Sequence, residues 1–378
     1  MKKIKILHVL TDTNIGGAGT LLINYLHCFN KDKYDISVCL PSGAALAPLV
    51  EAEGYRVISL EHGRDKSFEC SAISEFHKLF KREKPDIVHT HSAFSAKLAA
   101  YLAGVKSRIY TRHCVFDMPK RLTSFPGKQI NGFINNTLAT RIVAVAEAAR
   151  DNLIETGVDD KKITVIINGV MPVRRTSDEE KKELKKHLGI SDTSFVAGIP
   201  ARLEHYKGHS YLIEAVREIK EKYPNIVFLL MGEGSEEKRL KDMAVSLGVS
   251  DKIIFTGFVD DLAPYYNIMD LNLNCSYGTE TSSLSLSEGM SLGIPAIATT
   301  FGGNPYMITE GVNGLLVLPK DSHAMAEAIL KLLSDRELLK KLGEGAAEEY
   351  KKKFTAEAMT RQLEGIYDAE AKRIIKKK

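Results

Sequence analysis

The chain has 378 residues, of which 44% are hydrophobic and 26% are charged, and its formal net charge is +4. This composition is typical of a globular protein, and the length favours two domains over a single core. No stretch approaches the ~20 apolar residues of a membrane span. The five cysteines are scattered and form no C-x-x-C pair, which argues against a zinc site and a disulfide framework.

The net positive charge is confined to the first half. Residues 1–170 carry 23 Lys and Arg against 17 Asp and Glu, whereas residues 171–378 carry 29 against 31. The excess fits an anionic partner, either a membrane surface or a phosphorylated acceptor, and ordinary solvated surface explains it equally well. No basic run is interleaved with aromatic residues, so nucleic acid is not an expected partner. The short apolar run that opens the chain is interpreted as a strand rather than a signal peptide, and we expect a cytoplasmic protein.

Short apolar runs alternate with amphipathic helical patterns along the chain. Buried parallel strands are predicted in two series, separated by a polar break near 171–177. The first series is 3–10, 34–40, 55–60, 86–92, 107–113, 141–146 and 163–169, and the second is 195–201, 226–232, 253–258, 271–276, 295–300 and 314–318. The alternation predicts two Rossmann-like, doubly wound α/β domains, residues 1–171 and 172–355, facing each other across a cleft.

Two glutamates eight residues apart mark the most informative stretch, residues 277–299. A helix is predicted to begin near Ser282, with Ser282 or Thr281 as its N-cap. Its free N–H groups would face Glu280 and suit an anion such as a diphosphate. Glu288 would lie roughly 9 Å along the helix, at about 1.5 Å per residue. This layout fits a nucleotide sugar, with the sugar near Glu280 and the ribose near Glu288.

A second cluster of charge follows the strand at 195–201. Arg202 and Lys207 leave the strand end on one loop, which suits two cations that clamp a diphosphate. The chain contains no Asp-x-Asp metal motif. We therefore expect these cations and the helix amides to neutralise a leaving diphosphate without a metal.

The two elements together resemble a known enzyme family. The Glu280-x7-Glu288 spacing before Gly293-x-Pro295, with Arg202-x4-Lys207-Gly208, is similar to the signature of retaining glycosyltransferases of GT-B fold, in particular family 4. The resemblance covers nearly the whole chain and is more specific in the second domain. It implies a GT-B fold and a metal-independent hexosyltransferase that uses a nucleoside-diphosphate sugar, in particular a UDP-sugar, as co-substrate.

In the first domain the resemblance points to glycines and a histidine at strand ends. Gly16 and Gly17 follow the first strand, where glycine lets backbone approach a phosphate or sugar. His113 matches the histidine that in the family lies close to the donor sugar and its phosphate, and we favour it over His91. His89 and His91 also form a His-x-His pair, but no third metal ligand is evident in the sequence, so no metal site is expected.

In the second domain the resemblance assigns most of the donor site. Glu280 would orient the sugar or stabilise positive charge, and Glu288 would bind the ribose. The remaining expected contacts to the nucleotide and its phosphates come from Gly232, Phe258, Thr281, Ser282, Ser283 and Leu284. The common family turn after the first glutamate is Gly-Phe-Gly-Leu, and here it is Thr-Ser-Ser-Leu. This departure puts the identity of the sugar in doubt.

The expected reaction is transfer to a hydroxyl of a saccharide or lipid-linked saccharide, in bacterial cell-surface polysaccharide or glycolipid synthesis. A C-terminal helix, residues 356–378, is expected to return to the first domain. The basic and apolar segment 117–141 either borders the acceptor site and contacts an anionic membrane peripherally or simply covers the first sheet. Two alternatives stay open: a sugar-nucleotide epimerase of the same fold, and a non-catalytic partner subunit of a glycosyltransferase.

Overall fold

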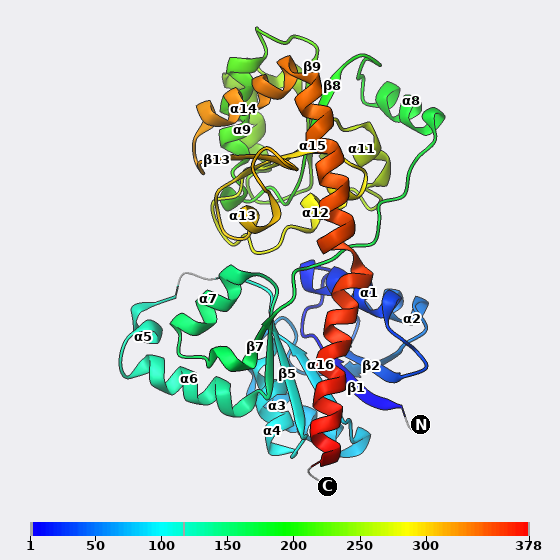
Figure 1. Ribbon diagram of the computed structural model, residues 1–378, viewed down its shortest axis with the longest axis vertical. Coiled ribbons are helices and arrows are strands. Elements are labelled where there is room, and N and C mark those ends of the chain that lie inside the picture. Colours follow the sequence, from blue (N-terminus) through cyan, green and yellow to red (C-terminus); the bar gives the residue numbers. More distant parts are fainter. Residues whose placement is uncertain (1–2, 116–117, 377–378) are drawn as a thin grey trace. The chain divides into compact units, whose positions relative to one another are not determined.

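The computed structural model describes residues 3–115 and 118–376. The chain divides into two compact units, Met1–Gly169 with Ala356–Lys378, and Val170–Thr355 (Figure 1). Residue 117 of the expected basic segment and residues 377–378 of the expected last helix lie outside the described residues.

The first unit is built on a seven-stranded parallel sheet. Its strand order, β3-β2-β1-β4-β5-β6-β7, reverses direction beside β1, as in doubly wound α/β folds. Every strand expected in this half is present, although the last one ends four residues early. The strands are β1 (Ile4–Val9), β2 (Tyr34–Pro41), β3 (Arg56–Leu60), β4 (Ile87–His91), β5 (Ser107–Arg112), β6 (Arg141–Ala144) and β7 (Ile163–Val165).

Helices cover the strands of this sheet. Leu21, Leu22 and Tyr25 of the first helix share one buried cluster with Leu363 and Tyr367 of the last helix. The last helix therefore belongs to the core of the first unit. The helices are α1 (Gly17–Cys28), α2 (Ala47–Ala52), α3 (Cys70–Glu83), α4 (Phe94–Leu102), α5 (Lys120–Thr123), α6 (Gly127–Leu138), α7 (Glu147–Glu155) and α16 (Ala356–Lys376), with a 3-10 turn at Asp160–Lys162.

The second unit contains a six-stranded parallel sheet in the order β10-β9-β8-β11-β12-β13. All six strands expected from the apolar runs are present. The two central neighbours, β8 and β11, are buried at every residue, which explains the unbroken apolar and small-residue sequence of β8. The strands are β8 (Phe195–Pro200), β9 (Ile226–Met231), β10 (Ile253–Gly257), β11 (Leu271–Asn274), β12 (Ala296–Thr299) and β13 (Gly314–Val317).

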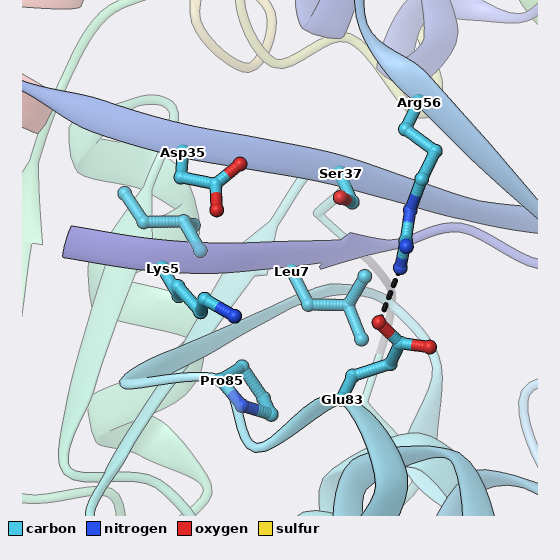
Figure 2. A pocket seen from close by; sticks show the side chains of 8 residues that line it. Lys5, Leu7, Asp35, Ser37, Arg56, Glu83 and Pro85 are labelled. Atoms are coloured by element: carbon cyan, nitrogen blue, oxygen red, sulfur yellow. Dashed lines mark hydrogen bonds and ion pairs between the residues drawn. The ribbon is translucent and has the colours of Figure 1, made fainter. Parts of the chain in front are cut away.

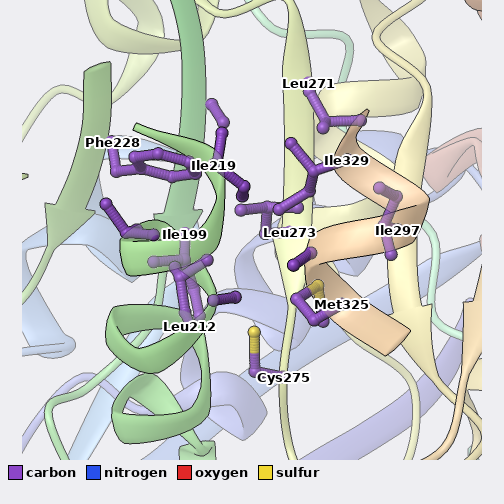
Figure 3. Close-up of a cluster of buried hydrophobic side chains, with 14 of the residues drawn as sticks. Ile199, Leu212, Ile219, Phe228, Leu271, Leu273, Cys275, Ile297, Met325 and Ile329 are labelled. Carbon is purple, nitrogen blue, oxygen red and sulfur yellow. The ribbon is translucent and has the colours of Figure 1, made fainter. Parts of the chain in front are cut away.

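The core of the second unit lies between this sheet and two of its helices. Leu212 and Ile219 from one helix and Ile329 from another pack against Phe228 and Leu273 of the sheet (Figure 3). The helices are α8 (Asp178–His187), α9 (His209–Ile219), α10 (Glu237–Ser246), α11 (Ala263–Ile268), α12 (Leu284–Ser291), α13 (Asn304–Met307), α14 (Ser322–Ser334) and α15 (Arg336–Glu349), with 3-10 turns at His205–Lys207 and Ser250–Lys252 and a π-turn at Tyr350–Phe354.

Membrane insertion by a helix finds no support in the described residues, because none of their helices is both long and apolar enough to cross a bilayer. The two parallel sheets each have loops at the carboxyl ends of their strands, where ligands of such sheets bind.

Candidate functional site

A buried ion pair lies at the carboxyl edge of the second sheet. Lys207 Nζ is 2.9 Å from Glu280 Oε2, and the two side chains are only 18% and 7% exposed. Ser276 Oγ also donates to this carboxylate at 2.8 Å, and Asn274 Nδ2 donates at 3.3 Å. Burial alone would raise the pKa of Glu280, but the charge and hydrogen bond of Lys207, with the two neutral donors, hold the pKa below its usual value. Glu280 is therefore ionised at neutral pH.

The loop after β8 brings the two expected cations to this edge. Arg202 is exposed and donates from Nη2 to the Tyr206 hydroxyl at 2.9 Å, and Lys207 Nζ lies 5.9 Å from the centre of the same ring. Gly208 then turns the chain into α9 with φ +74°, and a Cβ at this position would lie 2.0 Å from the Cys275 carbonyl oxygen. Glycine is required here because the loop must approach β11 closely for Lys207 to reach Glu280.

The helix expected near Ser282 is α12, but it begins two residues later than predicted. Its N-cap is Ser283, whose Oγ accepts from the Leu286 amide, so the expected caps Ser282 and Thr281 were wrong. Thr281, Ser282 and Ser283 are all buried. The first-turn amides of a helix lack intrahelical acceptors, and Leu286 is satisfied by the cap. The amides of Leu284 and its neighbour Ser285 are thus the donors that α12 offers to an anion.

Glu288 lies on α12, closer to the helix start than expected. It is four residues after Leu284, which corresponds to about 6 Å along the axis at about 1.5 Å per residue. The Tyr266 hydroxyl donates to Glu288 Oε2 at 2.7 Å. Burial raises the pKa of Glu288, and the hydrogen bond from Tyr266 opposes this shift. A partly buried carboxylate with one neutral donor is suited to accept further hydrogen bonds from hydroxyl groups.

Two further expected positions lie on neighbouring loops of the same unit. Gly232 has φ +144°, and its amide donates to the carbonyl of Gly257 at 2.9 Å. A Cβ on Gly232 would lie 2.4 Å from the Ala201 carbonyl oxygen. Phe258 is 69% exposed, and its amide donates to Glu233 Oε1 at 3.3 Å. Gly232 follows β9, which pairs with β8, and Phe258 follows β10, which pairs with β9, so both residues lie at the carboxyl edge of the same parallel sheet.

The residues that pack against the backbone of the Glu280 turn were not predicted from the sequence. Gly302 and Gly303 lie so close that added Cβ atoms would be 2.1 Å from the Glu280 carbonyl oxygen and 1.4 Å from the Thr281 carbonyl oxygen. The Gly-Gly pair after β12 was the available signal. Asn274, the last residue of β11, and Ser276, two residues later, were likewise visible as polar residues at a strand end but were not assigned.

The expected glycines of the first unit lie at the end of the loop that connects β1 to α1. Gly16 is the N-cap of α1 and Gly17 is its first residue. Added Cβ atoms at either position would meet no protein atom within 4 Å. Protein packing therefore does not require these glycines, which leaves room for the close approach of a ligand to this backbone.

His113 lies just beyond β5, at one end of a buried chain of hydrogen bonds. His91 Nδ1 and His113 Nε2 are 2.9 Å apart, and His8 Nδ1 and His91 Nε2 are 3.0 Å apart. The Tyr367 hydroxyl of α16 joins His8 Nε2 at 3.1 Å to His89 Nδ1 at 2.7 Å. The last hydrogen bond of this series joins His89 Nε2 to the Thr111 hydroxyl at 2.6 Å.

The number of available protons fixes the direction in which the hydrogen bonds of this series are donated. Burial lowers the pKa of His8 to about 3 and that of His113 to about 4, so each ring is neutral and carries one proton. If the Thr111 hydroxyl donates to His89, every following donor finds an acceptor and His113 keeps its proton on Nδ1. In the opposite direction the Thr111 hydroxyl proton has no acceptor among the described residues. This direction of donation makes Nε2 of His113 the acceptor of the hydrogen bond from His91. The proton of His113 then lies on Nδ1, beyond the end of the hydrogen-bonded series.

The same cluster bears on the expected absence of a metal. His8, which the sequence argument did not consider, supplies the third ligand that His89 and His91 lacked: one ring nitrogen from each lies within 4.8 Å of the others. All six ring nitrogens of these three residues already take part in the hydrogen bonds of the chain. A bound metal would have to break that chain.

A separate hollow in the first unit lies at the opposite edge of the sheet. It is lined by Lys5 near the start of β1, Asp35 near the start of β2 and Arg56 at the start of β3 (Figure 2). Arg56 forms an ion pair with Glu83. Because ligands of parallel sheets bind at the carboxyl ends of strands, this amino-terminal hollow is not a candidate site.

Replacing Tyr367 by Phe tests the histidine chain. The change leaves His8 Nε2 and His89 Nδ1–H buried without partners, which we expect to lower the free energy of unfolding by about 1–3 kcal/mol in urea titrations. Nitrogen-15 NMR of the histidine rings should show mixed tautomers at His113 in place of one. Tyr25→Phe is the matched control, because the buried Tyr25 hydroxyl has no partner among the described residues. Equal effects of the two changes would contradict the ordered chain.

Comparison with known protein families identifies both halves of the chain. Residues 15–174 match the family model described as Glycosyltransferase Family 4, and residues 180–349 match the model described as Glycosyl transferases group 1. The UDP-Gal:alpha-D-GlcNAc-diphosphoundecaprenol alpha-1,3-galactosyltransferase of Escherichia coli is 28% identical over 348 residues, which cover 89% of each chain.

Solved structures agree in fold. A glycosyltransferase from Rickettsia africae superposes with a TM-score of 0.84 at 23% identity, covering 98% of this chain and 99% of that one. The Anabaena protein HepE in complex with UDP-glucose gives 0.83 at 22% identity, covering 97% and 100%. The expected GT-B fold is confirmed, and the chain belongs to glycosyltransferase family 4, of the glycosyl transferases group 1.

Proposed function

We propose that this glycosyltransferase is a retaining, metal-independent enzyme that moves a hexose from a UDP-sugar to a hydroxyl of a saccharide or lipid-linked saccharide acceptor. The observation that carries the proposal is the buried Lys207–Glu280 pair beside the N-terminus of α12. It combines a cation, a set of free amides and an ionised carboxylate within one strand-end site. These are the groups that departure of a nucleoside diphosphate from a sugar requires.

Donor assignment draws on relatives as well as on the site. The E. coli relative uses UDP-Gal according to its name, and HepE was solved with UDP-glucose. Both support UDP as the nucleotide here. Neither fixes the sugar, because the Thr281–Leu284 turn of this chain differs from the common family turn. The E. coli name also supports a glycan acceptor linked to a lipid through a diphosphate, in the assembly of a bacterial surface glycan.

In the proposed reaction the bond between the sugar C1 and the β-phosphate oxygen breaks, and the acceptor oxygen bonds to C1 on the same face. Arg202, Lys207 and the first amides of α12 take up the negative charge that develops on the diphosphate. The departing phosphate oxygen accepts the proton of the acceptor hydroxyl, so no separate base is needed. Arg202 is suited to this role because its exposed guanidinium retains donors beyond the one given to Tyr206.

The carboxylates and the histidine have distinct proposed roles. Glu280 is ionised and would stabilise positive charge on the sugar or orient its hydroxyls, while Glu288 would accept from the ribose hydroxyls. His113, through the outward Nδ1–H that its hydrogen-bond chain favours, would donate to the sugar or its phosphate. A neutral imidazole of fixed tautomer can donate without adding a charge to the site.

Removing the clamp tests the donor site. Arg202→Ala should lower kcat by a factor on the order of 10²–10³, as does loss of one donor to a developing anion. Lys207→Ala should have a similar effect and should also destabilise the fold, because it leaves Glu280 buried without its partner. Arg217→Ala, which removes an exposed cation from α9, serves as the control. Initial rates with a UDP-sugar decide it, and activity within threefold of the parent in either clamp variant would reject the clamp.

Metal independence is a second test. If Arg202, Lys207 and helix amides supply the positive charge, turnover should survive excess EDTA at an unchanged rate. The measurement is UDP release after dialysis against the chelator. A complete loss of activity that Mg²⁺ or Mn²⁺ restores would overturn the proposed mechanism.

Peripheral membrane contact, at the cytoplasmic face in the proposed setting, is the third test. The first half of the chain carries an excess of six positive charges, and exposed Phe125 and Phe133 lie in the basic segment. Each basic residue near an anionic surface contributes ~1 kcal/mol to the free energy of binding. The screening length shortens to ~3 Å at 1 M salt, which removes most of this attraction. Co-sedimentation with anionic liposomes should therefore be strong at low salt and lost at 1 M. No binding at low salt, or binding indifferent to salt, would remove the membrane from the proposal.

A further inference from the structure

A second pocket lies at the carboxyl edge of the first sheet, and no residue of the proposed donor site lines it. Its walls come from the ends of β4 and β5, from α4, α5, α6 and α7, and from Met118 just before α5. Among the described residues that line it, two are cationic and none is acidic. They are Ser67, Ser92, Phe94, Lys97, Tyr110, Arg112, Met118, Leu122, Asn131, Ile134, Asn135, Leu153 and Thr156.

Lys97 is the unusual member of this set, because it is only 4% exposed and has no carboxylate partner among the described residues. Its Nζ donates to Asn135 Oδ1 at 2.7 Å and lies 4.4 Å from the centre of the Tyr110 ring. Asn135 is itself oriented by donating from Nδ2 to the Asn131 carbonyl at 2.9 Å. An ammonium has three N–H donors, so Lys97 keeps donors beyond the one that Asn135 accepts.

The electrostatic environment of Lys97 is unfavourable in the free protein. Burial, with a smaller contribution from the charge of Arg112, lowers the pKa of Lys97 to about 8, so the side chain is still largely protonated at pH 7. Lys97 is also the fourth residue of α4 and lies near the positive end of the helix dipole, where cations are disfavoured. A buried charge without an opposite charge is costly. An anion in the pocket would offset this cost.

Part of the pocket wall is apolar, and it borders exposed apolar residues of α6. Phe94, Leu122, Ile134 and Leu153 line the pocket together with the cations. On α6, Ile130 lies four residues before Ile134 and three residues before Phe133, so its side chain neighbours both of them. Ile130 and Phe133 are 56% and 73% exposed. A hydrocarbon chain attached to an anion in the pocket would cover this face.

We infer that the Lys97 pocket binds an amphiphile in which a phosphate or diphosphate group is joined to a hydrocarbon chain. The anionic group lies against Lys97 and Arg112, and the chain lies over the exposed apolar face of α6. The inference rests on the proposed function only in naming this amphiphile as the lipid-linked acceptor. It places recognition of the acceptor's phosphate in the first unit, separate from the diphosphate clamp of the donor.

The test is calorimetric binding of farnesyl diphosphate to the full chain, with UDP present at saturation to occupy the donor clamp. Lys97→Met removes the charge, keeps an unbranched chain and should not destabilise the fold. It should weaken binding roughly 10- to 100-fold, the loss expected for a charge-assisted hydrogen bond. Asn135→Asp, a nearly isosteric change, should weaken binding similarly because an internal carboxylate would neutralise Lys97. Lys106→Met, which removes an exposed charge from the same unit, should bind as the parent does.

Two further probes separate the possible sources of the anion. Farnesol should bind far more weakly than farnesyl diphosphate, and inorganic diphosphate should too, because the pocket needs both the charge and the chain. Unchanged affinity in Lys97→Met and Asn135→Asp would overturn the inference, as would equal binding of farnesol or of inorganic diphosphate. A separate UDP titration distinguishes the two proposals. Absence of UDP binding would count against the glycosyl-transfer proposal, whereas the Lys97 result would stand.

Discussion

The ion pair between Lys207 and Glu280 fixes the geometry on which the rest of the candidate site depends. It joins the loop after β8 to the turn after β11, two segments that are 73 residues apart in the chain. The pair can form only because Gly208 lets the first loop approach the carbonyl of Cys275. Breaking it would leave a charge buried under protein, which costs several kcal/mol. The site is therefore held rigid before any ligand arrives, as preorganised electrostatic stabilisation requires.

Backbone amides contribute to the proposed anion-binding site alongside the cations of the loop after β8. Thr281, Ser282 and Ser283 are buried, and the cap at Ser283 fixes the first turn of α12. Behind the turn, Gly302 and Gly303 permit a backbone contact that no other residue would allow. A turn with different side chains can thus present the same amides to a phosphate. In the proposed function, nucleotide binding therefore does not depend on the side chains of the family turn, whereas contacts to the sugar can differ.

The first unit handles buried polar groups in two opposite ways. The four histidines of the chain from His113 to His89 satisfy one another through neutral hydrogen bonds, and the Tyr367 hydroxyl completes the chain from the last helix. Lys97, in contrast, stays charged and lacks a counter-charge among the described residues. Neutral networks rigidify a core because each member is satisfied. An unmatched charge instead stores a cost that a ligand can relieve, which is why the two clusters suggest positioning and binding respectively.

The sequence by itself determined the thirteen strands of the two sheets, because buried parallel strands produce local apolar runs between turn residues. It also indicated Arg202, Lys207 and the two glutamates, since strand ends and helix starts are local features. Local sequence could not specify the cap of α12, which depends on how the turn packs against the residues after β12. Nor could it bring His8, His89 and Tyr367 together, because their contacts span up to 359 residues. Long-range packing alone decided which polar groups are buried, and burial sets their charge, their partners and their chemistry.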